Sequence, residues 1–138
     1  MIEIRQFTMA DHERALALWR GLEGIGLSAA DARENMEPFL LRNAGLSFVA
    51  YDNGTLVGTV LCGQDGRRAY LYHLAVAGSH RRRKLGYALA QRCLSALRQC
   101  GIEKCHLFVY ADNAPAIAFW KQNGWLTRND LMLMSQKL

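Results

Sequence analysis

Residues 69–110 carry the pattern that most restricts the fold of this chain. An apolar and aromatic run at 69–76 is followed by a short basic loop, an amphipathic helical pattern at 85–100 and a second apolar run at 105–110. Two strands connected in sequence through a helix run parallel, and the crossover between them is right-handed. The unit therefore predicts a right-handed crossover between two parallel strands.

The rest of the chain predicts antiparallel strands and further helices. Asn53-Gly54 between two apolar runs is a strong signal for a two-residue hairpin turn, and a second turn at 65–68 leads into the run at 69–76, which makes a meander of three strands. The other expected elements are a first strand from Ile2, helices at 11–22 and 28–42, strands at 47–51 and 55–61, a helix that ends at Gln122, and a closing hairpin of strands at 125–126 and 131–135.

Length and composition predict one compact domain. The chain has 138 residues, 51% of them hydrophobic, and no apolar run approaches the ~20 residues of a membrane span. The first residues lack the basic flank and apolar stretch of a secretory signal, and the four cysteines lack C-x-x-C spacing. We therefore expect a single domain over 1–138 in the cytoplasm, with reduced thiols, no metal and no membrane partner.

A run of four cations, Arg81, Arg82, Arg83 and Lys84, follows His80 and stands at the start of the amphipathic helix. The first amides of a helix have no intrahelical partner, and the helix dipole places positive potential behind them. Together with four cationic side chains they make an anion site, which a phosphate or pyrophosphate fits best. The other interpretations are a solvated charged face, a nucleic-acid contact and an acidic lipid surface.

Two sequence blocks stand in a fixed order, separated by one helix and one strand. The first is Leu74-Ala75-Val76 followed by Arg81-Arg82-Arg83-Lys84-Leu85-Gly86 and Ala88-Leu89, and the second, 113–125, reads N-A-P-A-I-A-F-W-K-Q-N-G-W. The first resembles the acyl-CoA signature Arg/Gln-x-x-Gly-x-Gly/Ala of the GCN5-related N-acetyltransferase (GNAT) superfamily, and the second resembles its Asn-x-x-Ala-x-x-(aromatic or Leu)-Tyr-x-x-x-Gly-(aromatic) block. The resemblance covers nearly the whole chain and looks most like the small YpeA-type acetyltransferases.

This resemblance implies a fold and an activity. The fold is of the α/β (α+β) class, with a GNAT-like, mixed, mostly antiparallel twisted sheet of six to seven strands, a splayed parallel central pair and helices on both faces. The activity is transfer of an acetyl group from acetyl-CoA to a primary amine of a small molecule, a protein N-terminus or a lysine, by direct attack. The partners are then acetyl-CoA and an amine acceptor, and the protein is a monomer or a homodimer.

The resemblance also implies a donor site. Main-chain groups of Leu74 and Val76 would bond to the acetyl carbonyl and the pantetheine arm, and the amides of 81–86 would hold the pyrophosphate. Asn113 would lie near the pantetheine, and the rings at 119–120 near the thioester. The implied cofactor-binding residues are Leu74, Ala75, Val76, Arg81, Arg82, Arg83, Lys84, Leu85, Gly86, Tyr87, Asn113, Ala116, Phe119 and Trp120.

Two residues depart from the family pattern. Lys84 stands where the first glycine is usual, but it keeps an amide N–H and adds charge, so binding is expected to survive unless this position needs a positive φ. Trp120 stands where many members have the tyrosine that protonates the departing thiolate, and an indole N–H cannot serve as that acid.

The candidates for proton transfer are Tyr72, His73 and Tyr110, with His106 as a further histidine on the second parallel strand. Neighbouring residues of a regular strand point to opposite faces, so Tyr72 and His73 are not expected to face one cleft together. No aspartate or glutamate stands in the strands where the family often keeps a general base. Assignment of the base is therefore open between these side chains.

Two other functions remain open at this stage. A non-catalytic acyl-CoA sensor is favoured by the tryptophan at 120, and a nucleic-acid-binding module would use the cations at 81–84 on phosphates. Acidic residues in the N-terminal half argue against a broad basic face. The helices around 20–40 are expected to wall the acceptor pocket, where Glu23, Glu34 or Glu37 could attract a cationic amine.

Overall fold

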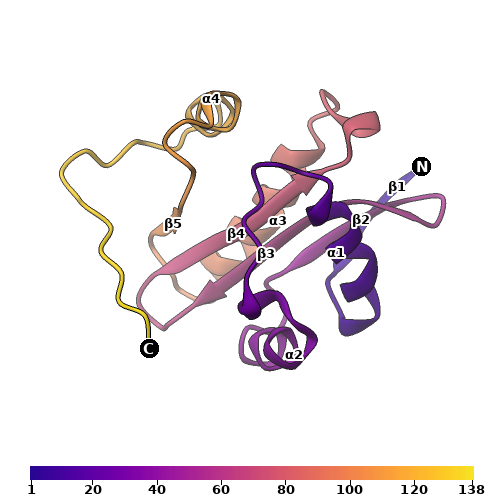
Figure 1. The fold of residues 1–138 in the computed structure, drawn as a ribbon, viewed down its shortest axis with the longest axis horizontal. Coiled ribbons are helices and arrows are strands. Elements are labelled where there is room, and N and C mark those ends of the chain that lie inside the picture. Colours follow the sequence, from indigo (N-terminus) through magenta and orange to yellow (C-terminus); the bar gives the residue numbers. More distant parts are fainter. The chain divides into compact units, whose positions relative to one another are not determined.

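This computed structural model describes residues 1–138, which form two compact units, 1–108 and 109–138. The first unit contains one five-stranded sheet in the order β1-β2-β3-β4-β5 (Figure 1). Its strands are β1 (Ile2–Gln6), β2 (Phe48–Asp52), β3 (Thr55–Gln64), β4 (Ala69–Val76) and β5 (Cys105–Leu107), and its helices are α1 (His12–Arg20), α2 (Arg33–Arg42) and α3 (Leu85–Gln99). The second unit contains α4 (Ala114–Gln122). The single domain expected over 1–138 stays a prediction.

The sheet confirms the predicted crossover. Strands β1 to β4 pair as antiparallel neighbours, whereas β4 and β5, which α3 connects, pair in parallel. The predicted hairpin between β2 and β3 is also present, with φ of 49° at Asn53 and 85° at Gly54. Positive φ at both central residues is what a type I′ turn requires, and Asn-Gly adopts it at little cost.

Two adjacent residues of β3 show which helix covers which face of the sheet. A Cβ built on Gly58 would lie 2.9 Å from Cδ1 of Leu89 in α3, whereas the Thr59 hydroxyl accepts a 2.8 Å hydrogen bond from Nε1 of Trp19 in α1. Because successive residues of a strand point to opposite faces, α1 and α3 lie on opposite sides. Helix α2 shares the face of α1 (Figure 1), since a Cβ on Gly63 would meet Phe39 at 2.9 Å.

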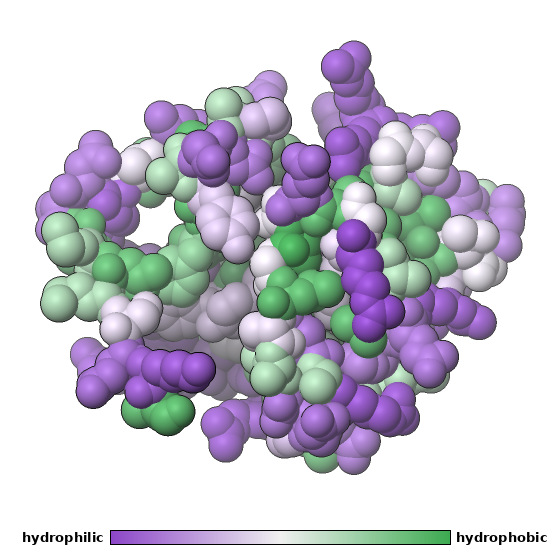
Figure 2. Space-filling view, viewed as in Figure 1, coloured by the Kyte–Doolittle hydropathy of each residue, from purple (hydrophilic) through white to green (hydrophobic).

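The core on the α1 and α2 face centres on Trp19, whose side chain has no exposed surface. Its ring stacks on Phe7 with centroids 6.2 Å apart, and Met36 and Val49 complete the packing around it. Truncating a buried tryptophan removes about 3–5 kcal/mol of stability. Figure 2 shows hydrophilic side chains across much of one face of the molecule, with smaller apolar areas between them.

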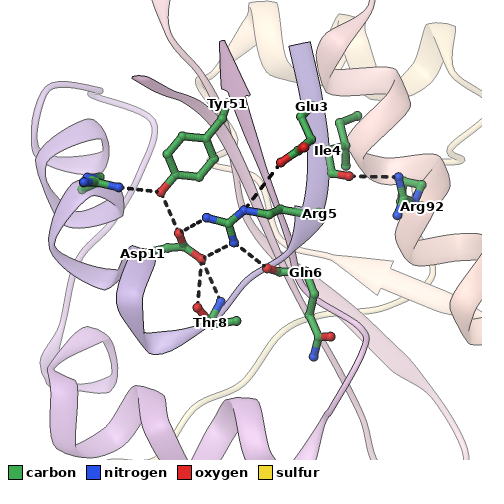
Figure 3. Close-up of polar contacts among 9 residues, drawn as sticks. Glu3, Ile4, Arg5, Gln6, Thr8, Asp11, Tyr51 and Arg92 are labelled. Atoms are coloured by element: carbon green, nitrogen blue, oxygen red, sulfur yellow. Dashed lines mark hydrogen bonds and ion pairs between the residues drawn. The ribbon is translucent and has the colours of Figure 1, made fainter. Parts of the chain in front are cut away.

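A polar network around Asp11, which immediately precedes α1, connects the start of this helix to the sheet (Figure 3). The buried carboxylate of Asp11 accepts two hydrogen bonds from the Arg5 guanidinium, at 2.8 and 3.1 Å, one from the Tyr51 hydroxyl at 2.6 Å and one from the Thr8 amide at 2.9 Å. Burial alone would raise the pKa of Asp11, but these hydrogen bonds outweigh it and lower that pKa. The network replaces the water that this carboxylate loses on folding.

The structure corrects several boundaries. The sheet has five strands rather than six to seven, because 125–126 and 131–135 form no strand. Strand β5 is also shorter than expected, since it ends at Leu107 instead of 110. The segment 131–135 reads L-M-L-M-S, an apolar run that has none of the β-branched or aromatic residues that favour a strand. The predicted start of α2 at 28 is a separate 3₁₀ turn, Ala29–Asp31. No helix in the structure combines the length and hydropathy needed to cross a membrane.

Candidate active site

The parallel strands β4 and β5 pair over a short stretch only and then separate. Strand β4 pairs with β5 only over Ala69, Tyr70 and Leu71, opposite Cys105, His106 and Leu107. Beyond that point β4 continues to Val76 while β5 has ended, so the edge of 72–76 that faces away from β3 has no strand partner. This is the opening that the splayed central pair implied, and it leaves main-chain groups of β4 free to bond with a ligand.

The turn before α3 presents a run of unpaired amides. The first hydrogen bond into the helix runs from the Ala88 amide to the Lys84 carbonyl at 3.0 Å, and the amides of 82–87 donate to no group in the protein. No side chain caps this end. Arg82 and Lys84 have φ of 64° and 60°, and alternation into the left-handed region curls successive N–H groups around a concavity that suits an anion. The turn therefore has the main-chain donors that the expected anion site requires.

Lys84 has the positive φ that glycine, the usual residue at this position of the family pattern, adopts without strain. Its φ of 60° and ψ of 20° lie in the left-handed region, where a residue with a Cβ is strained by roughly 1–2 kcal/mol. The departure from the family pattern therefore costs stability at the start of α3. The amide of Lys84 is nonetheless among those that have no partner.

His80 fastens the loop to the sheet instead of adding to its cations. Its Nε2 lies 2.7 Å from a carboxylate oxygen of Asp52 at the end of β2, and its Nδ1 lies 2.7 Å from the hydroxyl of Ser79. The hydrogen bond from His80, with help from the N-terminal amine, lowers the pKa of Asp52. The start of the anion loop is thus held by a contact between segments 28 residues apart.

A β-bulge brings Tyr72 and His73 to the same face, which corrects the expectation that they point apart. Thr59 pairs with Ala75 and Leu61 with Tyr72, so one residue of β3 opposes two of β4, and His73 has φ of 50°. The extra residue breaks the alternation of side chains. The Tyr72 ring contacts Phe39 of α2, and the His73 ring contacts Trp19 of α1 at 4.7 Å, both on the face that these helices cover.

His73 belongs to a buried polar network that the sequence did not reveal. Its Nε2 lies 2.7 Å from a carboxylate oxygen of Asp31, and its main-chain carbonyl accepts a 2.8 Å hydrogen bond from the Thr59 hydroxyl. Asp31 is itself buried and is held by the Ser28 amide at 2.9 Å. When the Nε2–H donates to this carboxylate, Nδ1 carries the lone pair and has no hydrogen-bond partner, which is the state of a proton acceptor.

The sequence pattern around Asp31 indicated a helix start and did not indicate its contact with His73. Ser28 and Asp31 form a capping box, and that spacing was interpreted only as the start of a helix. The two partners His73 and Asp31 are 42 residues apart, and no local pattern connects them. Only the packing of the 3₁₀ turn against the bulge brings them together.

A pocket of about 380 Å³ lies on the same face, between α2, the end of β3 and the start of β4. Helix α2, which lies in the region expected to wall the acceptor pocket, lines it, but Glu23, Glu34 and Glu37 do not. The residues of α2 that do are Asn35, Pro38, Phe39 and Arg42; the others are Asn43, Gly63, Gln64, Asp65, Tyr70 and Tyr72. Burial, with a smaller effect of Tyr70, raises the pKa of Tyr72, which therefore stays a neutral phenol.

The remaining predicted residues lie in the second unit, 109–138. Asn113 caps α4, because its side-chain oxygen accepts a 3.2 Å hydrogen bond from the Ala116 amide. Trp120 is packed between two other rings, with centroids 5.0 Å from Phe119 and 5.1 Å from Trp125. Tyr110 precedes α4, and its carbonyl accepts a hydrogen bond from the Asn113 amide at 2.9 Å. Within this unit, the second sequence block thus forms one capped helix with an aromatic cluster.

Two of the four cysteines, Cys93 and Cys105, are poor nucleophiles. All four are free thiols, and burial raises the pKa of Cys105 to about 12. The pKa of Cys93 is raised too, by a hydrogen bond with Cys62 and by burial. Since the thiolate is the reactive form, Cys93 and Cys105 are unsuited to carry an acyl group.

Comparison with known proteins places these features in one family. The acetyltransferase (GNAT) family model matches residues 5–125. An acetyltransferase of Yersinia pestis (strain Pestoides F) is 32% identical over 132 residues, which make up 96% of this chain and 93% of that protein.

Solved structures show the same fold. A GNAT-family acetyltransferase from Staphylococcus aureus Mu50 has a TM-score of 0.81 at 21% identity, covering 100% of this chain and 92% of its own. The PaiA N-acetyltransferase from Thermoplasma acidophilum, solved in complex with coenzyme A, has a TM-score of 0.77 at 20% identity, covering 94% and 92%. With the family model matched over most of its length and a relative 32% identical along 96% of it, the chain belongs to the acetyltransferase (GNAT) family and is an N-acetyltransferase.

Proposed function

We propose that this protein binds acetyl-CoA at the start of α3 and transfers its acetyl group to a primary amine of a small molecule, a protein N-terminus or a lysine. The observation that carries the proposal is the run of unpaired amides at 82–87, next to the free edge of β4. Family membership supports acyl-CoA-dependent acetyl transfer, and the T. acidophilum relative was solved with coenzyme A bound.

In this proposal the main-chain amides and the cationic side chains of the loop both bind the pyrophosphate. The amides of 82–87 offer short, directional hydrogen bonds with the α3 dipole behind them, and Arg81, Arg82, Arg83 and Lys84 supply charge around them. Leu85, Gly86 and Tyr87 contribute as main-chain donors. The preformed turn means that little ordering is needed when the ligand arrives.

The pantetheine arm is proposed to lie along the free edge of β4. Leu74, Ala75 and Val76 stand just before the anion loop, in the stretch of β4 that β5 leaves unpaired. An amide-bearing arm can bond to such an edge as an added strand does. That course would bring the thioester toward 72–74, and a main-chain N–H there would polarise its carbonyl. Asn113, Ala116, Phe119 and Trp120 of the second unit are retained as proposed contacts to the pantetheine and thioester.

His73 is proposed as the general base. The neutral amine attacks the thioester carbon, its proton passes to Nδ1 of His73, the C–S bond breaks and the thiolate of coenzyme A departs. Asp31 acts as a positioning residue, since its carboxylate fixes the imidazole tautomer and stabilises the imidazolium that forms. A coenzyme A thiol has a pKa near that of free cysteine, about 8.5, so it leaves readily. Tyr72, a neutral phenol on the same face as His73, and Tyr110 are the proposed candidates to protonate it.

The test combines binding and turnover. Isothermal titration calorimetry with coenzyme A should give a saturable heat, and thiol release from acetyl-CoA should depend on added amine. Absence of both heat and ligand-induced thermal stabilisation would exclude the proposed donor site. Heat without thiol release across a broad amine panel would instead identify a non-catalytic acyl-CoA sensor.

A further inference from the structure

The pocket between α2 and β4 has two chemically different ends. One end reaches Tyr72, the residue before His73, and Asn35, whose amide nitrogen donates to the Ala29 carbonyl at 2.7 Å. That bond leaves the Asn35 side-chain oxygen as an acceptor. The other end is lined by Arg42 and Gln64, at the close of α2 and of β3.

The spacing of the two ends follows from regular geometry. Gln64 pairs with Ala69, so the Arg42 end lies level with the start of β4, three residues before Tyr72. Three steps of a strand, and equally the seven residues of helix from Asn35 to Arg42, both span about 10 Å. A molecule that occupies both ends must therefore be elongated.

The Arg42 end has the polarity to bind an anion. The Arg42 guanidinium has no hydrogen bond or ion pair within the protein, and the Gln64 amide nitrogen also has no acceptor. Asp65 lines the same end, but one of its carboxylate oxygens accepts 2.8 Å bonds from the amides of Arg67 and Arg68, which lower its pKa. Asp65 is thus held by amides of its own turn, and Arg42 is the charged residue at this end that has no partner within the protein.

The middle of the pocket is aromatic. Phe39 and Tyr72 meet edge to face with centroids 6.3 Å apart, and Tyr70 stacks beside Tyr72 at 6.4 Å. These rings offer apolar surface to a spacer, while the hydroxyls of Tyr70 and Tyr72 lack partners in the protein. An apolar chain between two polar groups would thus find matching surroundings along its length.

We infer that the acceptor is an elongated amine that ends in a carboxylate, with its amine at the Asn35 and Tyr72 end, its apolar spacer on Phe39, and its carboxylate on Arg42. This inference rests on the proposed function, because it gives that reaction its substrate class. Guanidinium and carboxylate form paired hydrogen bonds, so Arg42 sets affinity and does not take part in the chemistry.

The experiment compares ω-amino carboxylates of four to nine carbons with alkylamines of the same length, as acceptors of acetyl from acetyl-CoA. The carboxylate should raise kcat/KM about tenfold or more at six to eight carbons, where the two charged ends reach about 10 Å, and less at four. Arg42→Gln should remove that gain through KM, so that the carboxylates react no better than the alkylamines of the same length. Arg33→Gln, an exposed arginine of the same helix outside the pocket, is the matched control and should retain the gain.

Calorimetry with 7-aminoheptanoate separates this inference from the proposed function. Heat from the amino acid that Arg42→Gln abolishes supports the acceptor site, whether or not acetyl-CoA turns over. Failure of coenzyme A to bind would overturn the donor site. Equal kcat/KM for the carboxylates and the alkylamines, or an equal loss in both series with Arg42→Gln, would overturn the acceptor class alone.

Discussion

The two sides of the opening in the sheet are built in opposite ways. The proposed donor side, 81–87, is one continuous segment of unpaired amides and cations, whereas the proposed acceptor side combines Asp31, the bulge at His73 and a pocket between α2 and β4. One site is local and the other depends on contacts between distant segments. A local site can be identified from its residues, while a site made by packing depends on the fold as a whole.

The largest expected effect is on the local side. Replacing Arg81 and Arg83 together by glutamate should weaken coenzyme A binding by about 100-fold or more, because two attractive charges become repulsive next to a pyrophosphate. Thermal stabilisation by acetyl-CoA should disappear with it. The pair Arg20→Glu and Arg33→Glu makes the same change in net charge outside the loop, and a similar loss in that variant would show that overall charge, not the loop, drives binding.

The second-largest effect is expected on kcat, from substitutions at His73 and Asp31 on the proposed acceptor side. His73→Gln should lower kcat by about 100-fold, as removal of a general base does, and Asp31→Asn by about tenfold. The dissociation constant for coenzyme A should stay the same in both, which separates a catalytic effect from unfolding. His106→Gln is the matched histidine variant on β5. If His73→Gln retains full kcat, another group removes the proton.

Low pH should weaken the contact between Asp52 and His80 that holds the start of the basic loop. The pKa of Asp52 is lowered in the folded state by His80, so its stabilising effect is present above the unfolded carboxyl pKa of about 3.9 and is lost as pH falls through the lower folded value. Thermal scans from pH 6 to 3 should show a smaller drop in melting temperature for Asp52→Asn than for the wild type. Glu13→Gln should leave the drop unchanged, and identical curves for all three proteins would contradict the anchor.

The smallest expected effect is at Lys84, where substitutions separate the contribution of the main-chain amide from that of the side-chain charge. Lys84→Gly relieves left-handed strain and should raise stability by roughly 0.5–1 kcal/mol, with coenzyme A affinity changed less than about threefold, because the N–H remains. Lys84→Ala loses the same charge but keeps the strain. A gain in melting temperature with alanine equal to that with glycine would show that backbone strain is not the cause.

The sequence predicted the parallel crossover, the hairpin at Asn53-Gly54 and the anion turn, since each depends on residues close together in the chain. It did not predict the bulge in β4, because nothing around His73 marks one in a strand that otherwise alternates. Asp31 was assigned only to a helix start, and Arg42 was not considered. Those roles arise from packing between α1, α2 and β4, which no local pattern encodes.

The backbone at His73 limits what evolution or a mutant library can place there. A φ of 50° is adopted with little penalty by glycine, asparagine, aspartate and histidine, and with more by other side chains. Of those four, only aspartate and histidine accept a proton under mild conditions. Randomising this codon should therefore return two active classes at most, however strong the selection for acetylation.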